Sequence, residues 1–90
     1  MVVAIIAIDK HDGRISTLPE IVTRGFLPAD NGQAVLDGAR DVIRRTIEQS
    51  NPEENKDWSV IKEKIRVDLK KYLNKQTSKR PLILPVILEV

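Results

Sequence analysis

The chain has 90 residues, no cysteine and a formal net charge of +2. This length predicts a single domain, residues 1–90, and the lack of cysteine excludes a disulfide framework, a thiolate zinc site and thiol catalysis. A cysteine-free chain fits the reducing cytoplasm, where we expect it, and the apolar run at residues 1–9 is too short for a signal peptide or membrane span.

Two apolar runs at the start of the chain predict a β-hairpin. Residues 2–8 (VVAIIAI) are rich in β-branched side chains, and residues 9–13 (DKHDG) supply turn chemistry before a second run at residues 14–23. Pro19 removes a backbone donor from the second run, which favours an edge position for this strand or a break at Pro19. Residues 2–8 are then the better central strand.

Two amphipathic helices are predicted next. The first begins near Asn31, where Asp30 has capping-box spacing, and runs to about Glu48. The second covers about residues 58–74 and can be capped by Asp57. Each carries one apolar stripe at spacings of three and four. The stripes comprise Val35, Ala39, Val42, Ile43, Thr46 and Ile47 in the first helix, and Trp58, Ile61, Ile65, Leu69, Tyr72 and Leu73 in the second.

The last apolar run, residues 82–90 (LILPVILEV), predicts a third strand, which Pro85 places at an edge or a bulge. If both helices span the domain, this strand runs parallel to the first, with sheet order 2-1-3. The predicted fold class is α+β: a two-layer ββααβ domain, with a three-stranded mixed sheet packed on two helices.

Two helices in one layer cover only one face of such a sheet, yet the first and third strands are apolar on both sides. The uncovered face would expose on the order of 300 Å² or more, near the largest patch that a monomer tolerates. A second copy, another domain of a longer chain, a helix of this chain or the loop at residues 25–33 could cover it. Since either face could be the free one, the interface candidates come from both: Val3, Ile5, Ile6, Ile83, Leu84, Val86 and Ile87.

Charge is distributed unevenly along the chain. Residues 1–55 hold 6 Lys and Arg against 9 Asp and Glu, and residues 56–90 hold 9 against 4, so the two parts carry −3 and +5. A solvated helix face explains this pattern, and so does a surface that neutralises RNA phosphates without base readout. The RNA-binding candidates are Lys62, Lys70, Lys71, Lys75, Lys79 and Arg80.

Residues with catalytic potential are sparse. His11 is the only histidine, and it lies in the predicted turn, where no nucleophile and base can be paired with it. Asp9 and Glu20 have the end spacing of an EF-hand loop, but Gly13 and Arg14 do not fit its pattern. No Gly-rich phosphate loop occurs. We therefore predict no catalytic residue, no metal ligand and no cofactor in this chain.

Three segments carry a resemblance to a known family: residues 8–15 (IDKHDGRI) with 20–26 (EIVTRGF), then Asp57-Trp58, then residues 80–90 (RPLILPVILEV). They resemble the C-terminal domain of bacterial ribonuclease J, within the metallo-β-lactamase/β-CASP ribonucleases. The resemblance spans essentially the whole chain. The segment 27–33 departs from the family pattern by carrying less charge, and Val60 stands where the family often has Glu.

The resemblance implies a parent that is a zinc-dependent hydrolase, cutting RNA internally and degrading it from the 5′ end. The zinc ligands of that family form a His-rich motif that this chain lacks, so the resemblance carries over no catalytic or metal residue. It implies a non-catalytic oligomerisation or assembly role, through a second copy or the parent's catalytic domain. The alternative is an RNA-holding module that uses the basic face of the second helix, and an independent small enzyme is disfavoured.

Overall fold

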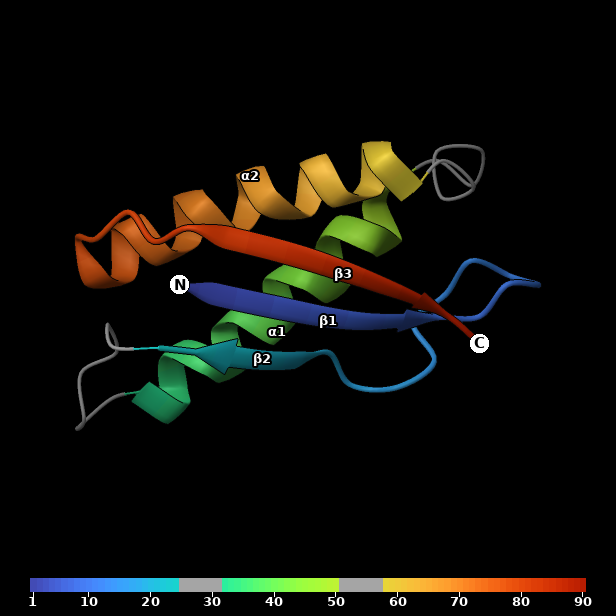
Figure 1. Ribbon diagram of the computed structural model, residues 1–90, viewed down its shortest axis with the longest axis horizontal. Coiled ribbons are helices and arrows are strands. Elements are labelled where there is room, and N and C mark those ends of the chain that lie inside the picture. The colour runs from blue at the N-terminus through green and yellow to red at the C-terminus, as the bar shows by residue number, and fades with distance from the viewer. Residues whose placement is uncertain (25–31, 51–57) are drawn as a thin grey trace.

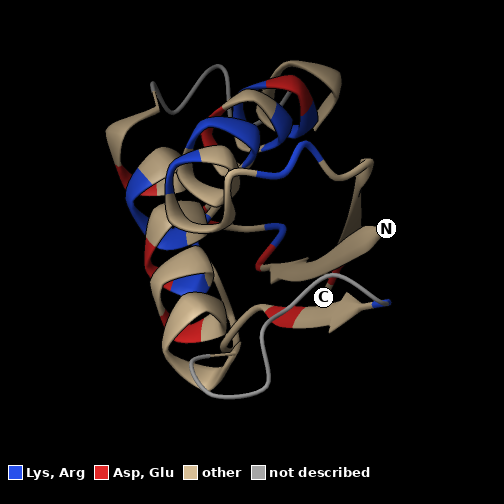
Figure 2. Ribbon diagram, turned by 90° about the vertical axis from the view of Figure 1, so that its left-hand side faces the viewer, with Lys and Arg blue, Asp and Glu red and all other residues tan. Residues whose placement is uncertain are grey.

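The computed structural model of the chain describes residues 1–24, 32–50 and 58–90. Two helices lie together on one side of a three-stranded sheet (Figures 1 and 2). This arrangement confirms the predicted two-layer α+β class. The elements in chain order are β1 (Val2–Ile8), β2 (Glu20–Thr23), α1 (Gly32–Gln49), α2 (Trp58–Thr77) and β3 (Ile83–Glu89).

The sheet has the order β2-β1-β3, as predicted. Strand β1 pairs antiparallel with β2 over Val2 to Ile5. It pairs parallel with β3 along the whole length of β1 and β3. A central strand flanked by two others suits the apolar run of β1, because its backbone groups find partners on both sides.

The second strand is shorter than the run at residues 14–23 predicted. Only Glu20–Thr23 forms β2, while Ile15 makes an isolated bridge with Ile8. Pro19, which has no N–H to donate, lies directly before β2, so regular pairing resumes only after it. The structure thus shows the break that Pro19 predicted, and the strand is regular only after it.

The helices begin near the predicted positions, although the proposed caps Asp30 and Asp57 lie outside the described residues. Helix α2 continues three residues beyond the predicted end, to Thr77. There Ser78 adopts a left-handed conformation (φ 59°), and its N–H donates to the carbonyl of Asn74 at 2.8 Å. This bond satisfies one of the unpaired carbonyls of the last turn, which explains where the helix ends.

One core fills the space between sheet and helices. It includes the predicted stripe residues Val35, Ala39, Ile43 and Ile47 of α1 together with Ile61, Ile65, Leu69 and Leu73 of α2. From the sheet come Val2, Ala4, Ile6, Ile8, Ile21, Ile83 and Ile87.

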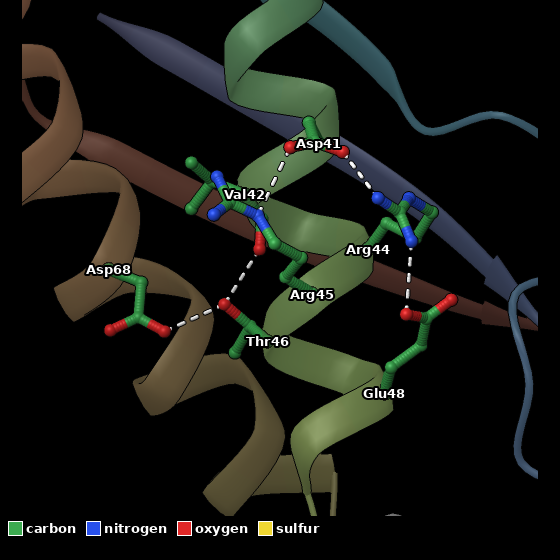
Figure 3. Close-up of polar contacts among 7 residues, drawn as sticks. All are labelled: Asp41, Val42, Arg44, Arg45, Thr46, Glu48 and Asp68. Atoms are coloured by element: carbon green, nitrogen blue, oxygen red, sulfur yellow. Dashed lines mark hydrogen bonds and ion pairs between the residues drawn. The ribbon is translucent and has the colours of Figure 1, made fainter.

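The two helices approach each other closely at Gly38. The hydroxyl of Tyr72 donates to the carbonyl of Val35 at 2.9 Å, and a Cβ at Gly38 would lie 1.9 Å from that hydroxyl oxygen. Further along, the buried Thr46 hydroxyl lies 2.7 Å from a carboxylate oxygen of Asp68 (Figure 3). Glycine is a poor helix former, but at position 38 it leaves room for the contact between the two helices.

Pro85 occupies a defined position on the outer edge of the sheet. The N–H of Val2 donates to Leu82 at 2.8 Å, and the N–H of Val90 donates to Ile8 at 3.0 Å. Backbone groups alternate along a strand, so even-numbered residues of β3 face β1 and odd-numbered ones, including Pro85, face outward. The missing N–H therefore falls on the unpaired edge, where proline is tolerated.

Candidate interaction surfaces

The side of the sheet that faces away from the helices is apolar. The register places Val3 between Val22 and Leu84, and Ile5 beside Val86. No described helix lies on this side of the sheet (Figure 2). We call this surface the open sheet face, and it consists of Val3, Ile5, Ala7, Val22, Leu84, Val86 and Leu88.

Exposure on the open sheet face is highest along the edge strands. Leu84 is 44% exposed, Val86 38% and Leu88 50%, while Val3 and Ile5 in the central strand are half-buried by their neighbours. Glu20, paired with Ile5 in the register, adds a carboxylate at the border. The result is a contiguous apolar surface of the kind that marks interaction sites.

The structure separates the predicted interface residues into two groups. Val3, Ile5, Leu84 and Val86 lie on the open sheet face. The other three, Ile6, Ile83 and Ile87, are buried under the helices and belong to the core. Their inclusion is corrected, because a side chain enclosed within its own domain cannot contact a partner.

Sequence reasoning left Ala7, Val22 and Leu88 out of the interface set. Ala7 and Leu88 continue the alternation of their own strands, so that signal was present in the sequence. The face occupied by Val22 depends on its pairing with Val3, which requires the hairpin register.

The predicted RNA-binding residues are all exposed, but they do not form one surface. Lys62 lies near the start of α2, two turns before Lys70. Arg66, which forms an ion pair with Glu63, lies between them on the same side of the helix. Lys75 lies in the last turn of α2, and Lys79 and Arg80 follow in the connection to β3. Five of the six therefore cluster at the C-terminal half of α2 and beyond it.

The arginines of α1, in contrast, are paired with acidic residues of the same helix. Arg44 contacts Asp41 and, at 3.0 Å, Glu48, while Arg45 lies 3.1 Å from Asp41 (Figure 3). The hydrogen bond from Arg44 lowers the pKa of the Asp41 carboxyl, and the same bond raises the pKa of Arg44. The positive charge of α1 is thus locally neutralised.

A cleft of about 920 Å³ lies between residues 12–19 and the outer side of α1. Arg40 spans it, since its Nε donates to the carbonyl of Pro19 at 3.0 Å and its Nη1 lies 3.0 Å from Asp37. Charges of both signs line the cleft and pair with one another, so it shows no preference for an anion or a cation.

Within residues 1–24, 32–50 and 58–90, no group of three or more His, Asp and Glu side chains is placed to hold a metal ion. His11, Asp9 and Asp12 are in the turn after β1, where the carboxylates of Asp9 and Asp12 accept backbone N–H groups at 2.7 and 2.9 Å. Neither of the two described helices, α1 and α2, is long and apolar enough to cross a membrane.

The fold and its surfaces define a class: a small two-layer α+β domain with one uncovered apolar sheet face. Comparison with known proteins gives the family. The family model of the ribonuclease J C-terminal domain matches residues 1–90, and the chain belongs to that family.

Curated relatives agree with this assignment. The chain is 35% identical over 88 residues to ribonuclease J 2 of Staphylococcus saprophyticus, and 34% identical over 88 residues to ribonuclease J 2 of Staphylococcus aureus. It is 29% identical over 90 residues to ribonuclease J2 of Bacillus subtilis. These matches cover 98%, 98% and 100% of this chain, which spans only 16% of the length of each relative.

Proposed function

We propose that this chain is a non-catalytic assembly domain of an RNA-degrading and RNA-processing ribonuclease, and that two copies associate through the open sheet face. The observation that carries the proposal is an apolar face, made by three strands, that no described element of the chain covers. Burial of exposed Val and Leu side chains stabilises an association at roughly 25 cal/mol per Å².

The size of the face sets the expected strength of the contact. A stable interface buries about 800 Å² on each partner, which is roughly one seventh of the 5784 Å² accessible surface of this chain. The open sheet face, at on the order of 300 Å² or more, supplies the apolar centre of such an interface and leaves the rim to polar neighbours. We therefore expect the isolated domain to dimerise weakly, with Kd in the micromolar range.

The chemistry of RNA cleavage is assigned in this proposal to another part of the parent protein. The relatives are ribonucleases about six times longer than this chain, and the described residues offer no metal cluster. The parent is proposed to be a zinc-dependent cytoplasmic hydrolase whose zinc is held outside this domain. Assembly would then hold two catalytic parts together.

The test compares two valines of equal exposure. Val86 on the open sheet face and Val60 on the outer side of α2 are each 38% exposed. Val86→Lys places a charge within the proposed contact, whereas Val60→Lys leaves that contact untouched. Size-exclusion chromatography with light scattering at about 10 to 300 μM protein measures the mass of each variant.

We expect the wild type and Val60→Lys to approach twice the monomer mass as concentration rises, and Val86→Lys to remain monomeric. A wild-type domain that stays monomeric throughout this range contradicts self-association. In that case both substitutions would be made in the full-length parent. If Val86→Lys destabilises the parent and Val60→Lys does not, the parent's catalytic domain is the partner that covers this face.

A further inference from the structure

A group of cationic side chains gathers at one end of the molecule. Three chain segments lie at this end: the C-terminal half of α2, the connection into β3 and the end of β2 (Figure 1). The N–H of Arg24 donates to Met1 at 3.0 Å and that of Val2 donates to Leu82 at 2.8 Å, so the end of β2 and the start of β3 flank the start of β1. We call this group the basic end, and it comprises Arg24, Lys70, Lys71, Lys75, Lys79 and Arg80.

Acidic residues are scarce around the basic end. Residues 69–88 contain no Asp or Glu, although they contain five Lys and Arg. Asp68, just before this stretch, points toward α1 and contacts the Thr46 hydroxyl at 2.7 Å (Figure 3). The charged side chains of residues 69–88 are therefore all positive.

The basic end differs from the arginines of α1 in its pairing. Arg44 and Arg45 each form an ion pair within their helix. Among the described residues, in contrast, none forms an ion pair with Arg24, Lys70, Lys71, Lys75 or Arg80. Side chains that form no ion pair with another described residue can bind an external anion, and binding releases their counterions.

The chemistry of this surface selects a ligand with repeated negative charges. Lys71 and Lys75 are four residues apart on α2, so their Cβ atoms are about 5–6 Å apart and both can reach one extended polyanion. The aromatic residue nearby, Tyr72, is half-buried, and its hydroxyl is bonded to Val35, so it offers no face for base stacking. Contacts would therefore be made to the backbone of a nucleic acid, without base readout.

We propose that the basic end binds the phosphate backbone of single-stranded RNA, as a contact outside the catalytic part of the parent. The choice of RNA among polyanions rests on the proposed function, in which the parent acts on RNA. The basic end and the open sheet face use different side chains, so a domain assembled through the sheet can still present its basic ends to substrate.

The test uses two double variants that remove equal charge from exposed helix positions. Lys71→Gln with Lys75→Gln changes the basic end, and Arg44→Gln with Arg45→Gln changes the paired arginines of α1. Fluorescence anisotropy with a labelled 20-nucleotide oligouridine measures Kd from about 50 to 200 mM salt. Anionic phosphatidylserine vesicles provide a second probe in the same buffers.

We expect the wild type to bind with strong salt dependence, and the Lys71 and Lys75 variant to bind roughly tenfold or more weakly at about 50 mM salt. Its log–log salt slope should be shallower by about 1.4, because each phosphate contact on a single strand contributes about 0.7. The α1 variant should bind within about twofold of wild type.

Three outcomes would overturn the proposal: no RNA binding at about 50 mM salt, equal loss in both double variants, or vesicle binding in the absence of RNA binding. Light scattering on the same samples separates this result from the assembly proposal. We expect the Lys71→Gln, Lys75→Gln variant to lose RNA affinity and still form the dimer. A wild-type domain that dimerises but binds no RNA would contradict only the inference about the basic end.

Discussion

The two faces of β1 are built from the same kinds of residue but have opposite surroundings. Val2, Ala4, Ile6 and Ile8 point into the core and are almost wholly buried, whereas the intervening residues 3, 5 and 7 lie on the open sheet face. Residues of a strand point alternately to the two sides, so one apolar run supplies both faces.

The difference shows what composition can and cannot indicate. A solvent-facing side of an antiparallel sheet normally alternates to polar residues, and this one does not. Residue type therefore indicates that both faces are suited to burial, while the position of the helices decides which one this chain buries by itself. The second face is left for an external partner in our proposal.

The largest expected effect is a difference in unfolding free energy between substitutions of two adjacent isoleucines, one on each face of β1. Ile6→Ala should lower the free energy of unfolding by about 3 to 4 kcal/mol, because Ile6 is fully enclosed and its loss leaves a cavity. Ile5→Ala should cost only about 1 kcal/mol in the monomer, since Ile5 is half-buried on the open sheet face. Urea denaturation at low micromolar protein measures both, and equal costs would contradict the assignment of the faces.

A smaller effect tests the close packing of α1 against α2, the two helices that cover the buried face. Gly38→Ala should destabilise the domain by about 1 to 3 kcal/mol, because the new Cβ meets the Tyr72 hydroxyl and forces the helices apart. Helix propensity alone predicts a gain of about 1 kcal/mol for the same change. Ala34→Gly, at an exposed position of α1, serves as the reverse control and should cost about 1 kcal/mol. A thermal scan in which Gly38→Ala raises Tm would refute the close packing.

The smallest effect concerns the alkaline limit of the helix pair. Burial, with a further contribution from the Asp37 carboxylate, raises the pKa of Tyr72 above its ordinary value. A raised folded pKa means that its stabilising effect is complete below about pH 10, and is lost as pH rises through the folded value. Tyr72→Phe should therefore show a shallower loss of stability than wild type above about pH 10. Parallel pH profiles for the two proteins would contradict this reading.

Much of the fold was predictable because each element carries its own pattern. The spacing of Ile61, Ile65 and Leu69 predicts the buried side of α2, and the sheet order follows from the number of reversals in the chain. The extent of β2 was less predictable, since the run at residues 14–23 contains Pro19 and its pairing depends on the neighbouring strand.

The surfaces were harder to predict than the elements. Both sides of β1 and β3 are apolar, so Ile6 and Ile87 could not be distinguished from Ile5 and Val86 without the helix positions. The contribution of Arg24 to the basic end was also missed, because it lies 46 residues before Lys70 in the chain and joins it only through the sheet. The pairing of Arg44 with Asp41 and Glu48, in contrast, follows from helical spacing alone.

Pro85 has a consequence for the kind of assembly the domain can form. An unblocked edge strand recruits another strand, which presents a new edge in turn, so growth continues into a fibre. The proline interrupts the outward row of donors in the middle of β3 and disfavours that route. A contact between two open sheet faces, in contrast, uses the same patch on both copies and ends at two. The fold thus disfavours growth into a fibre and is compatible with a closed dimer.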